Sequence, residues 1–310
     1  MSIFLTVFTY CAYVFIIAMY AVKLVKIIRT PAHLRWELYP VVHEAKKDYG
    51  SGYYEDVARW RQHRRKTLRK GIFHLLVENF RFSEHFKRNR GYWAVLLPWH
   101  IGFIFIVTFH ILCFFGAVVM AGGDIAVTAT SPEAIDRIFY YLILVTGVIS
   151  FTTGAFGSIG LLIKRLGDRD LKTFATTKNY FNYIFTLAVF SSGLYAWIFV
   201  DPTFAEYRKF WEGLVTLNPV NVAPATTAHI VLFAIFLIYL PFTRSLHYIT
   251  KFFAYLWIRW DDEPAAKGSK LEKDIAESLK KPVSWAAPHA GSGKSWGETV
   301  AGKKDDAEKT

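Results

Sequence analysis

The stretch LLPWHIGFIFIVTFHILCFF, residues 96–115, decides how this chain folds. It is almost wholly apolar over about 20 residues, the length at which an α-helix crosses the ~30 Å hydrocarbon layer of a bilayer. The same stretch carries two histidines, His100 and His110. Polar side chains are costly inside a bilayer, so the stretch predicts a transmembrane helix whose two imidazoles need partners.

Four more runs have the same character in a chain that is 53% hydrophobic. None alternates with the period of two that a barrel strand would show, so we expect helices. The fold class predicted is an all-α integral membrane protein with a five-helix transmembrane bundle. The five expected spans are 2–22, 93–121, 138–163, 180–200 and 225–249.

The positions of basic residues predict how the bundle is oriented. Lys23, Lys26 and Arg29 directly follow the first run, which places the N-terminus outside by the positive-inside rule. That run lacks the flanks of a cleaved signal peptide, so we expect it to remain as a helix. The stretch 122–136 holds no Lys or Arg and is expected outside, whereas the basic tail from residue 250 is expected to be cytoplasmic.

We expect the chain to have two parts that differ in composition. Residues 1–260 are expected to form the membrane domain, with a long cytoplasmic loop over 30–92 in which 71–82 is a short helix at the lipid interface. Residues 261–310 form a polar tail that either binds a partner or stays mobile. The net charge of +12 lies in the cytoplasmic segments, where topology and anionic membrane lipid explain it, so no nucleic-acid partner is expected.

Four of the ten histidines lie within predicted spans, two on the second and two on the fifth. These helices are antiparallel, so His100 pairs with His247 at the inner end and His110 with His229 at the outer end. The 18 residues between His229 and His247 make about five whole turns, so both side chains share one face. The ten residues between His100 and His110 leave an offset of about 80°.

Paired imidazoles from facing helices favour one kind of cofactor. Zinc needs three or four ligands at one point, whereas two histidines fill both axial positions of a haem, leaving electron transfer as its chemistry. The predicted ligands are therefore His100 with His247 and His110 with His229, for two haems. Arg244, one turn before His247, would pair with a propionate of the inner haem or reach the cytoplasmic surface.

Three glycines on the third span leave two readings open. Gly154, Gly157 and Gly160 lie three residues apart. Small residues let a backbone approach either a flat macrocycle or another helix.

The histidine pattern resembles that of the gamma subunit of respiratory nitrate reductase, a five-helix dihaem cytochrome b. Both spacings match that family's ligand pattern, and the resemblance covers roughly residues 1–260. It implies two haem b groups with the pairing given above, in a multi-pass protein of the bacterial inner membrane.

Two further stretches narrow the resemblance. RWELYPVVHE (35–44) and KFFAYLWIRWDDEP (251–264) are similar to the cytochrome b subunits of heterodisulfide-reductase-like complexes of sulfate reducers, of the Tmc type and then the Dsr type. This implies electron transfer across the membrane between menaquinone or a periplasmic multihaem cytochrome c and a cytoplasmic iron–sulfur subunit. The nitrate reductase subunit has a lysine at its quinol site, and the outer loop 122–136 has none, so any quinone site here is built differently.

Other classes of function remain as alternatives. Four intramembrane histidines would also suit a transporter that relays protons, although no Asp or Glu lies within a span core. A haem-free membrane anchor is a third candidate. If quinone reacts at the outer haem, carboxylates of the outer loops would exchange its protons with water. The candidates are Asp124, Glu133, Asp136, Glu206 and Glu212.

Overall fold

The computed structural model describes residues 2–28, 68–123, 127–243, 267–285 and 293–301. The chain forms two compact units, one of residues 1–19 and 74–243 and the other of residues 20–73 and 244–310. Arg244 and His247 lie outside the described residues, as do both stretches that carried the narrower resemblance.

In the part of the chain that the structure describes, five helices are long and apolar enough to cross a bilayer, which confirms the predicted five-helix bundle. No β-strand occurs among the described residues, so the class is all-α. The five helices are α1 (Ser2–Ile28), α4 (Arg90–Ala121), α5 (Ala134–Gly167), α7 (Thr177–Phe199) and α9 (Pro224–Tyr239).

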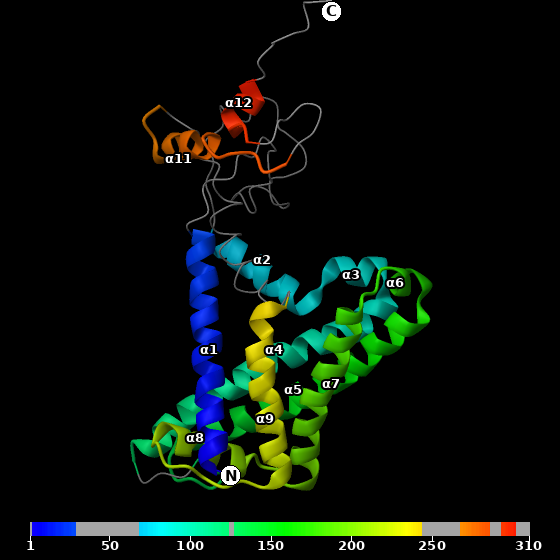
Figure 1. Cartoon of the computed structure of the whole chain (residues 1–310). Helices are drawn as coiled ribbons and strands as arrows, with labels where there is room; N and C mark the ends of the chain where they lie inside the picture. Colours follow the sequence, from blue (N-terminus) through cyan, green and yellow to red (C-terminus); the bar gives the residue numbers. More distant parts are fainter. Residues whose placement is uncertain (1, 29–67, 124–126, 244–266, 286–292, 302–310) are drawn as a thin grey trace, which may run out of the picture. The chain divides into compact units, whose positions relative to one another are not determined.

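Short helices mark the two ends of the bundle. Figure 1 shows α3 (Ser83–Arg88) and α6 (Arg169–Thr173) at the end predicted to be cytoplasmic. At the opposite end α8 (Ala205–Val215) lies near the start of α1 and of α9. The amphipathic helix expected over 71–82 is present as α2 (Leu68–Arg81).

The fifth span differs from its prediction at its C-terminal end. The apolar run suggested one helix over 225–249, but α9 ends at Tyr239 and a 3₁₀ turn, η2 (Leu240–Phe242), follows. Pro241 explains the change because proline has no N–H to donate and its ring collides with the carbonyl four residues earlier. The regular α-helical turns predicted between His229 and His247 are therefore interrupted after Tyr239, and His247 lies outside the described residues.

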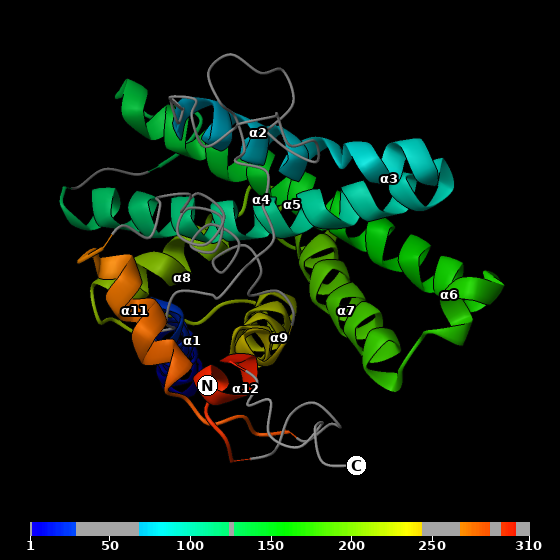
Figure 2. The same cartoon turned by 90° about the horizontal axis from the view of Figure 1, so that it is seen from above.

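Helices α4 and α5 make the closest contact in the bundle, and they run alongside each other in Figures 1 and 2. A Cβ added at Gly102 would lie 2.5 Å from the Cα of Gly154. One added at Gly157 would lie 2.3 Å from the backbone nitrogen of Trp99. A Cβ added at Gly154 or Gly160 would lie 2.4 Å from the side chain of Phe190 or Val95. Of the two readings of the glycine series, the structure therefore supports helix packing, since all three positions face residues of neighbouring helices.

Hydrogen bonds from side chains link α4 to both α5 and α7. The Ser150 hydroxyl donates to the carbonyl oxygen of Gly102 at 3.1 Å. The indole N–H of Trp99 donates to the Thr186 hydroxyl oxygen at 3.3 Å, which links α4 to α7. Such bonds between small and polar residues hold helices together in lipid, where hydrophobic burial gives little drive for association.

An aromatic cluster fills the half of the bundle that is predicted to lie outside, called here the outer half. The ring centroids of Phe109 and Phe204 lie 5.1 Å apart, and those of Phe109 and Phe151 lie 5.6 Å apart. Gly147 makes room for it, because a Cβ there would lie 2.6 Å from the ring of Phe204. Phe204 is fully buried and adopts a left-handed backbone conformation, with φ of 55°, where α8 begins.

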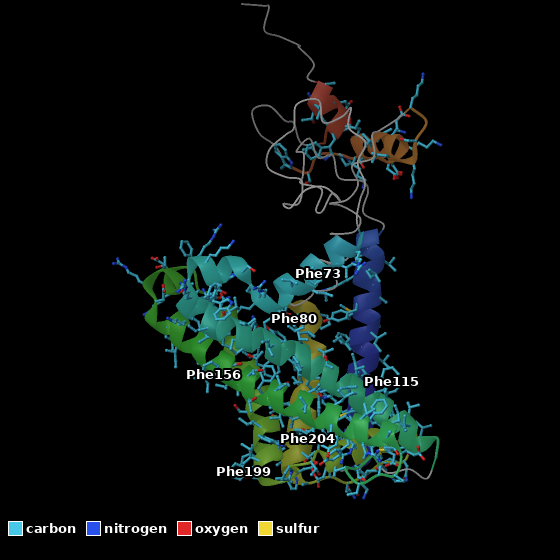
Figure 3. The ribbon with its side chains drawn as sticks, turned by 180° about the vertical axis from the view of Figure 1, so that it is seen from behind. Phe73, Phe80, Phe115, Phe156, Phe199 and Phe204 are labelled. Atoms are coloured by element: carbon cyan, nitrogen blue, oxygen red, sulfur yellow. The ribbon has the colours of Figure 1, made fainter. Side chains whose placement is uncertain are left out.

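The outward surface of the helices is apolar, as expected for contact with lipid chains. Phe115 on α4, Phe156 on α5 and Phe199 on α7 are more than half exposed, at 52%, 59% and 70%. Figure 3 shows these three side chains at the edges of the bundle. Their exposure is ordinary for a membrane protein and needs no partner protein.

The described part of the tail has local structure of its own. It contains α11 (Lys270–Leu279) and α12 (Trp296–Ala301). Between them an isolated antiparallel bridge pairs Pro282 with Ser295, next to the buried Val283.

Candidate functional site

His110 lies on α4 in the outer half of the bundle and is nearly buried. Its Nδ1 is 2.8 Å from the carbonyl oxygen of Ile106, one turn earlier on the same helix. A carbonyl oxygen can only accept, so Nδ1 carries the proton and donates it. This tautomer leaves Nε2 with a free electron pair, as a metal ligand requires.

His229 lies on α9 and is fully buried. Its Nδ1 is 3.0 Å from the carbonyl oxygen of Val189 and 2.9 Å from the hydroxyl oxygen of Ser192, both on α7. The proton is again on Nδ1 because the carbonyl accepts. Nε2 is buried and has no hydrogen-bond partner among the described residues. A buried polar atom without a partner is unfavourable, so this Nε2 is suited to binding a metal or another ligand.

The fold places both histidines beside the ring of Phe233. The centroid of the His110 ring lies 3.7 Å from that of Phe233 with 7° between planes, and the centroid of the His229 ring lies 6.2 Å away with 18° between planes. Helix α8 covers the pair. The ring centroids of Trp211 and His110 lie 6.1 Å apart. Those of Tyr207, one turn earlier on α8, and His229 lie 5.6 Å apart.

A small cavity of about 10 Å³, with room for about one water molecule, lies next to His110 between α1, α4, α8 and α9. Tyr13 and Tyr207 line it, and their hydroxyl oxygens are buried without a hydrogen-bond partner among the described residues. Burial raises the pKa of the Tyr207 phenol well above its ordinary value, so this hydroxyl keeps its proton. No sequence pattern pointed to either tyrosine, because a single phenol among apolar residues resembles any other aromatic core residue.

The residues present fit a haem at the outer end of the bundle. Two histidines on facing helices offer Nε2 electron pairs with their tautomers fixed, and their surroundings are apolar and aromatic. The cavity has room for about one water molecule, far less than a ligand pocket, so a macrocycle beside His110 requires neighbouring side chains such as Phe233 to move. His110 and His229 would hold its iron.

The inner pair is only half described. His100 lies on α4, and its ring meets that of Phe82 edge-on at 4.6 Å between centroids. Its predicted partner His247 and the nearby Arg244 fall outside the described residues. The inner haem and its propionate contact therefore remain predictions.

The outer carboxylates differ in their surroundings. Glu206 accepts from the N–H of Ala223 at 3.2 Å and from the hydroxyl of Thr226 at 2.5 Å, so it joins α8 to the start of α9. Asp136 is fully buried in the first turn of α5, and neither of its oxygens has a hydrogen-bond partner among the described residues. Glu133 is exposed and Glu212 half-buried, while Asp124 is outside the described residues.

Comparison with protein families matches residues 80–261 to the family model described as nitrate reductase gamma subunit. The matched region covers more than half of the chain and contains His100, His110, His229 and His247. It runs from α2 through α9 and beyond the last described residue of the bundle. Searches of curated proteins and of solved structures found no match.

Proposed function

The chain belongs to the nitrate reductase gamma subunit family, and from this premise we propose that it carries two haem b groups and conducts electrons across the membrane. Members of this family are haem b-binding membrane cytochromes that serve as subunits of oxidoreductases. The proposal adds the number of haems, their ligands and the path. His110 with His229 would hold the outer haem, and His100 with His247 the inner one.

The observation that carries the proposal is the pair of imidazoles at the outer end. Both histidines donate from Nδ1 to a backbone carbonyl, and the Nε2 of His229 is buried with no hydrogen-bond partner among the described residues. A proton-relaying histidine would need a second polar group at Nε2 to pass a proton onward. The apolar surroundings therefore favour an axial ligand over a relay. A haem bound through both axial positions supplies one-electron transfer.

The partners follow from the two ends of this path. Family members act beside catalytic and iron–sulfur subunits and exchange electrons with quinone. For this chain we propose a cytoplasmic iron–sulfur subunit at the inner end and menaquinone or a periplasmic multihaem cytochrome c at the outer end. The resemblance of residues 35–44 and 251–264 supports a heterodisulfide-reductase-like complex of the Tmc or Dsr type in a bacterial inner membrane.

The purified protein should contain two haem b groups per chain, because four intramembrane histidines make two axial pairs. A pyridine haemochrome assay combined with protein quantification measures this ratio. A single haem would limit the proposal to the outer site, and a haem-free preparation would support the anchor or transporter instead.

Quinone chemistry is proposed at the outer end, beside the cavity next to His110. A quinone is a flat apolar ring with two carbonyl oxygens, and Tyr13 and Tyr207 offer two buried hydroxyl donors without partners among the described residues. These phenols would take the binding role of the lysine absent from the outer loop. The observation favours hydrogen bonding from the bundle interior over contacts from loop carboxylates such as Glu206, whose oxygens already hold the start of α9.

A menaquinol analogue should change the absorption spectrum or potential of the outer haem, identified as the haem missing from His110→Ala. Tyr207→Phe should weaken that response about fivefold, the effect of one neutral hydrogen bond of ~1 kcal/mol. Tyr195→Phe, at an exposed position on α7, is the matched control and should respond as the original protein does. A change confined to the inner haem would place the site on the cytoplasmic side, and no change at either haem would favour direct exchange with an external cytochrome.

A further inference from the structure

We propose that Ser192 is a positioning residue for His229, whose hydroxyl oxygen fixes the imidazole and strengthens electron donation from Nε2 to the iron. The inference rests on the proposed function, because it assigns His229 as an axial ligand. No feature of the sequence pointed to Ser192, since serine is common in the apolar helices of membrane proteins.

The geometry around Ser192 determines the direction of its hydrogen bonds. Its hydroxyl lies 2.8 Å from the carbonyl oxygen of Val189, one turn earlier on α7, and donates its single proton there. The hydroxyl oxygen is then free to accept, and it lies 2.9 Å from the Nδ1 of His229. The same Nδ1 is 3.0 Å from the Val189 carbonyl oxygen. The Nδ1–H group of His229 is therefore shared between two acceptor oxygens, and these two oxygens are themselves joined by the hydrogen bond from Ser192 to Val189.

This arrangement has two physical consequences for an axial ligand. Two acceptors on α7 restrict rotation of the ring of His229, which is set on α9, so the plane of the imidazole is fixed relative to a second helix. They also draw the Nδ1 proton outward, which makes Nε2 a stronger donor and favours the oxidised iron. The site is fully buried at His229, so these bonds are stronger than they would be in water.

The two outer ligands are unequal in this respect. His110 has a single acceptor at Nδ1, the carbonyl oxygen of Ile106 on its own helix. His229 has a backbone acceptor and a side-chain acceptor, both from a neighbouring helix. Of these three acceptors, only the Ser192 hydroxyl can be removed by a substitution that leaves the backbone unchanged. Substitution of Ser192 therefore tests the inference directly.

The experiment compares Ser192→Ala, Ser192→Thr and Ser191→Ala in the full-length protein. Ser192→Ala removes the side-chain acceptor, and Ser192→Thr keeps a hydroxyl. Ser191→Ala makes the same deletion one position away, about 100° around the helix. The readouts are a redox titration of the outer haem and the electron paramagnetic resonance spectrum of its oxidised form, which reports the orientation of the two imidazole planes.

In Ser192→Ala the ratio of reduced to oxidised outer haem at a fixed potential should rise about threefold, ~28 mV for a one-electron couple. The resonance spectrum should shift as well. Ser192→Thr and Ser191→Ala should both match the original protein. Loss of the outer haem in Ser192→Ala with retention in Ser192→Thr would also support the positioning role.

An unchanged potential and spectrum in Ser192→Ala would overturn the inference, and so would an equal shift in Ser191→Ala. Both results are distinct from failure of the proposed function, which would show as absence of the outer haem from the unaltered protein.

Discussion

His110→Ala and His229→Ala should each remove one haem, and the same one, while the other haem stays bound. The reason is that both imidazoles stack on Phe233 with their Nδ1 protons committed to backbone carbonyls, so they meet at one site. Loss of either axial ligand leaves the iron held on one side only. The haem content should fall from two to about one per chain in each variant, a loss of about half of the total.

The measurement is haem quantification with redox titration, which identifies the component that is lost. His85→Ala is the control, since His85 is an exposed residue on α3, and its haem content should stay unchanged. His100→Ala and His247→Ala should both remove the other component. If His100→Ala and His110→Ala removed the same component, the antiparallel pairing would be wrong.

Gly157→Ala adds a single methyl group and should strongly destabilise the bundle. The added Cβ would lie 2.3 Å from the backbone nitrogen and 2.5 Å from the Cα of Trp99, and neither atom can turn aside as a side chain can. Helices α4 and α5 must therefore separate. Overpacking of a core typically costs about 1–3 kcal/mol, and a collision with backbone belongs at or above the top of that range.

Thermal unfolding in detergent, followed by helical circular dichroism and by the haem absorption band, measures this effect. Gly167→Ala is the matched control at the end of the same helix, where a Cβ would meet nothing within 4 Å. The control should unfold at or slightly above the temperature of the original protein. Equal unfolding temperatures for Gly157→Ala and Gly167→Ala would mean that the contact with Trp99 does not hold the two helices together.

The bundle could be predicted from the sequence because length and apolarity alone define a spanning helix. The end of the last span could not, since Pro241 stands inside an apolar run and only its effect on the helical hydrogen bonds reveals the turn at Leu240. The glycines of α5 remained ambiguous for a similar reason. Their spacing predicts a helix surface without side chains, but it does not predict which residue packs there. At Gly157 that residue is Trp99 of another helix.

The candidate site was predictable in part. The meeting of His110 and His229 followed from topology, because two residues at the same depth on antiparallel helices lie at the same end. The groups that complete the site did not follow. Ser192 and Tyr207 reach the histidines from α7 and from the short helix α8, and neither position carries a periodic or motif signal.

The close backbone contact of α4 with α5 also bears on biosynthesis. These helices are consecutive in the chain and joined by a short connection, so the pair can associate in the bilayer as soon as α5 leaves the ribosome. His110 belongs to this early pair, whereas His229 is translated more than a hundred residues later, on the last spanning helix. We therefore expect the outer site to stay open to lipid through most of synthesis, with cofactor capture as a late event that depends on arrival of α9.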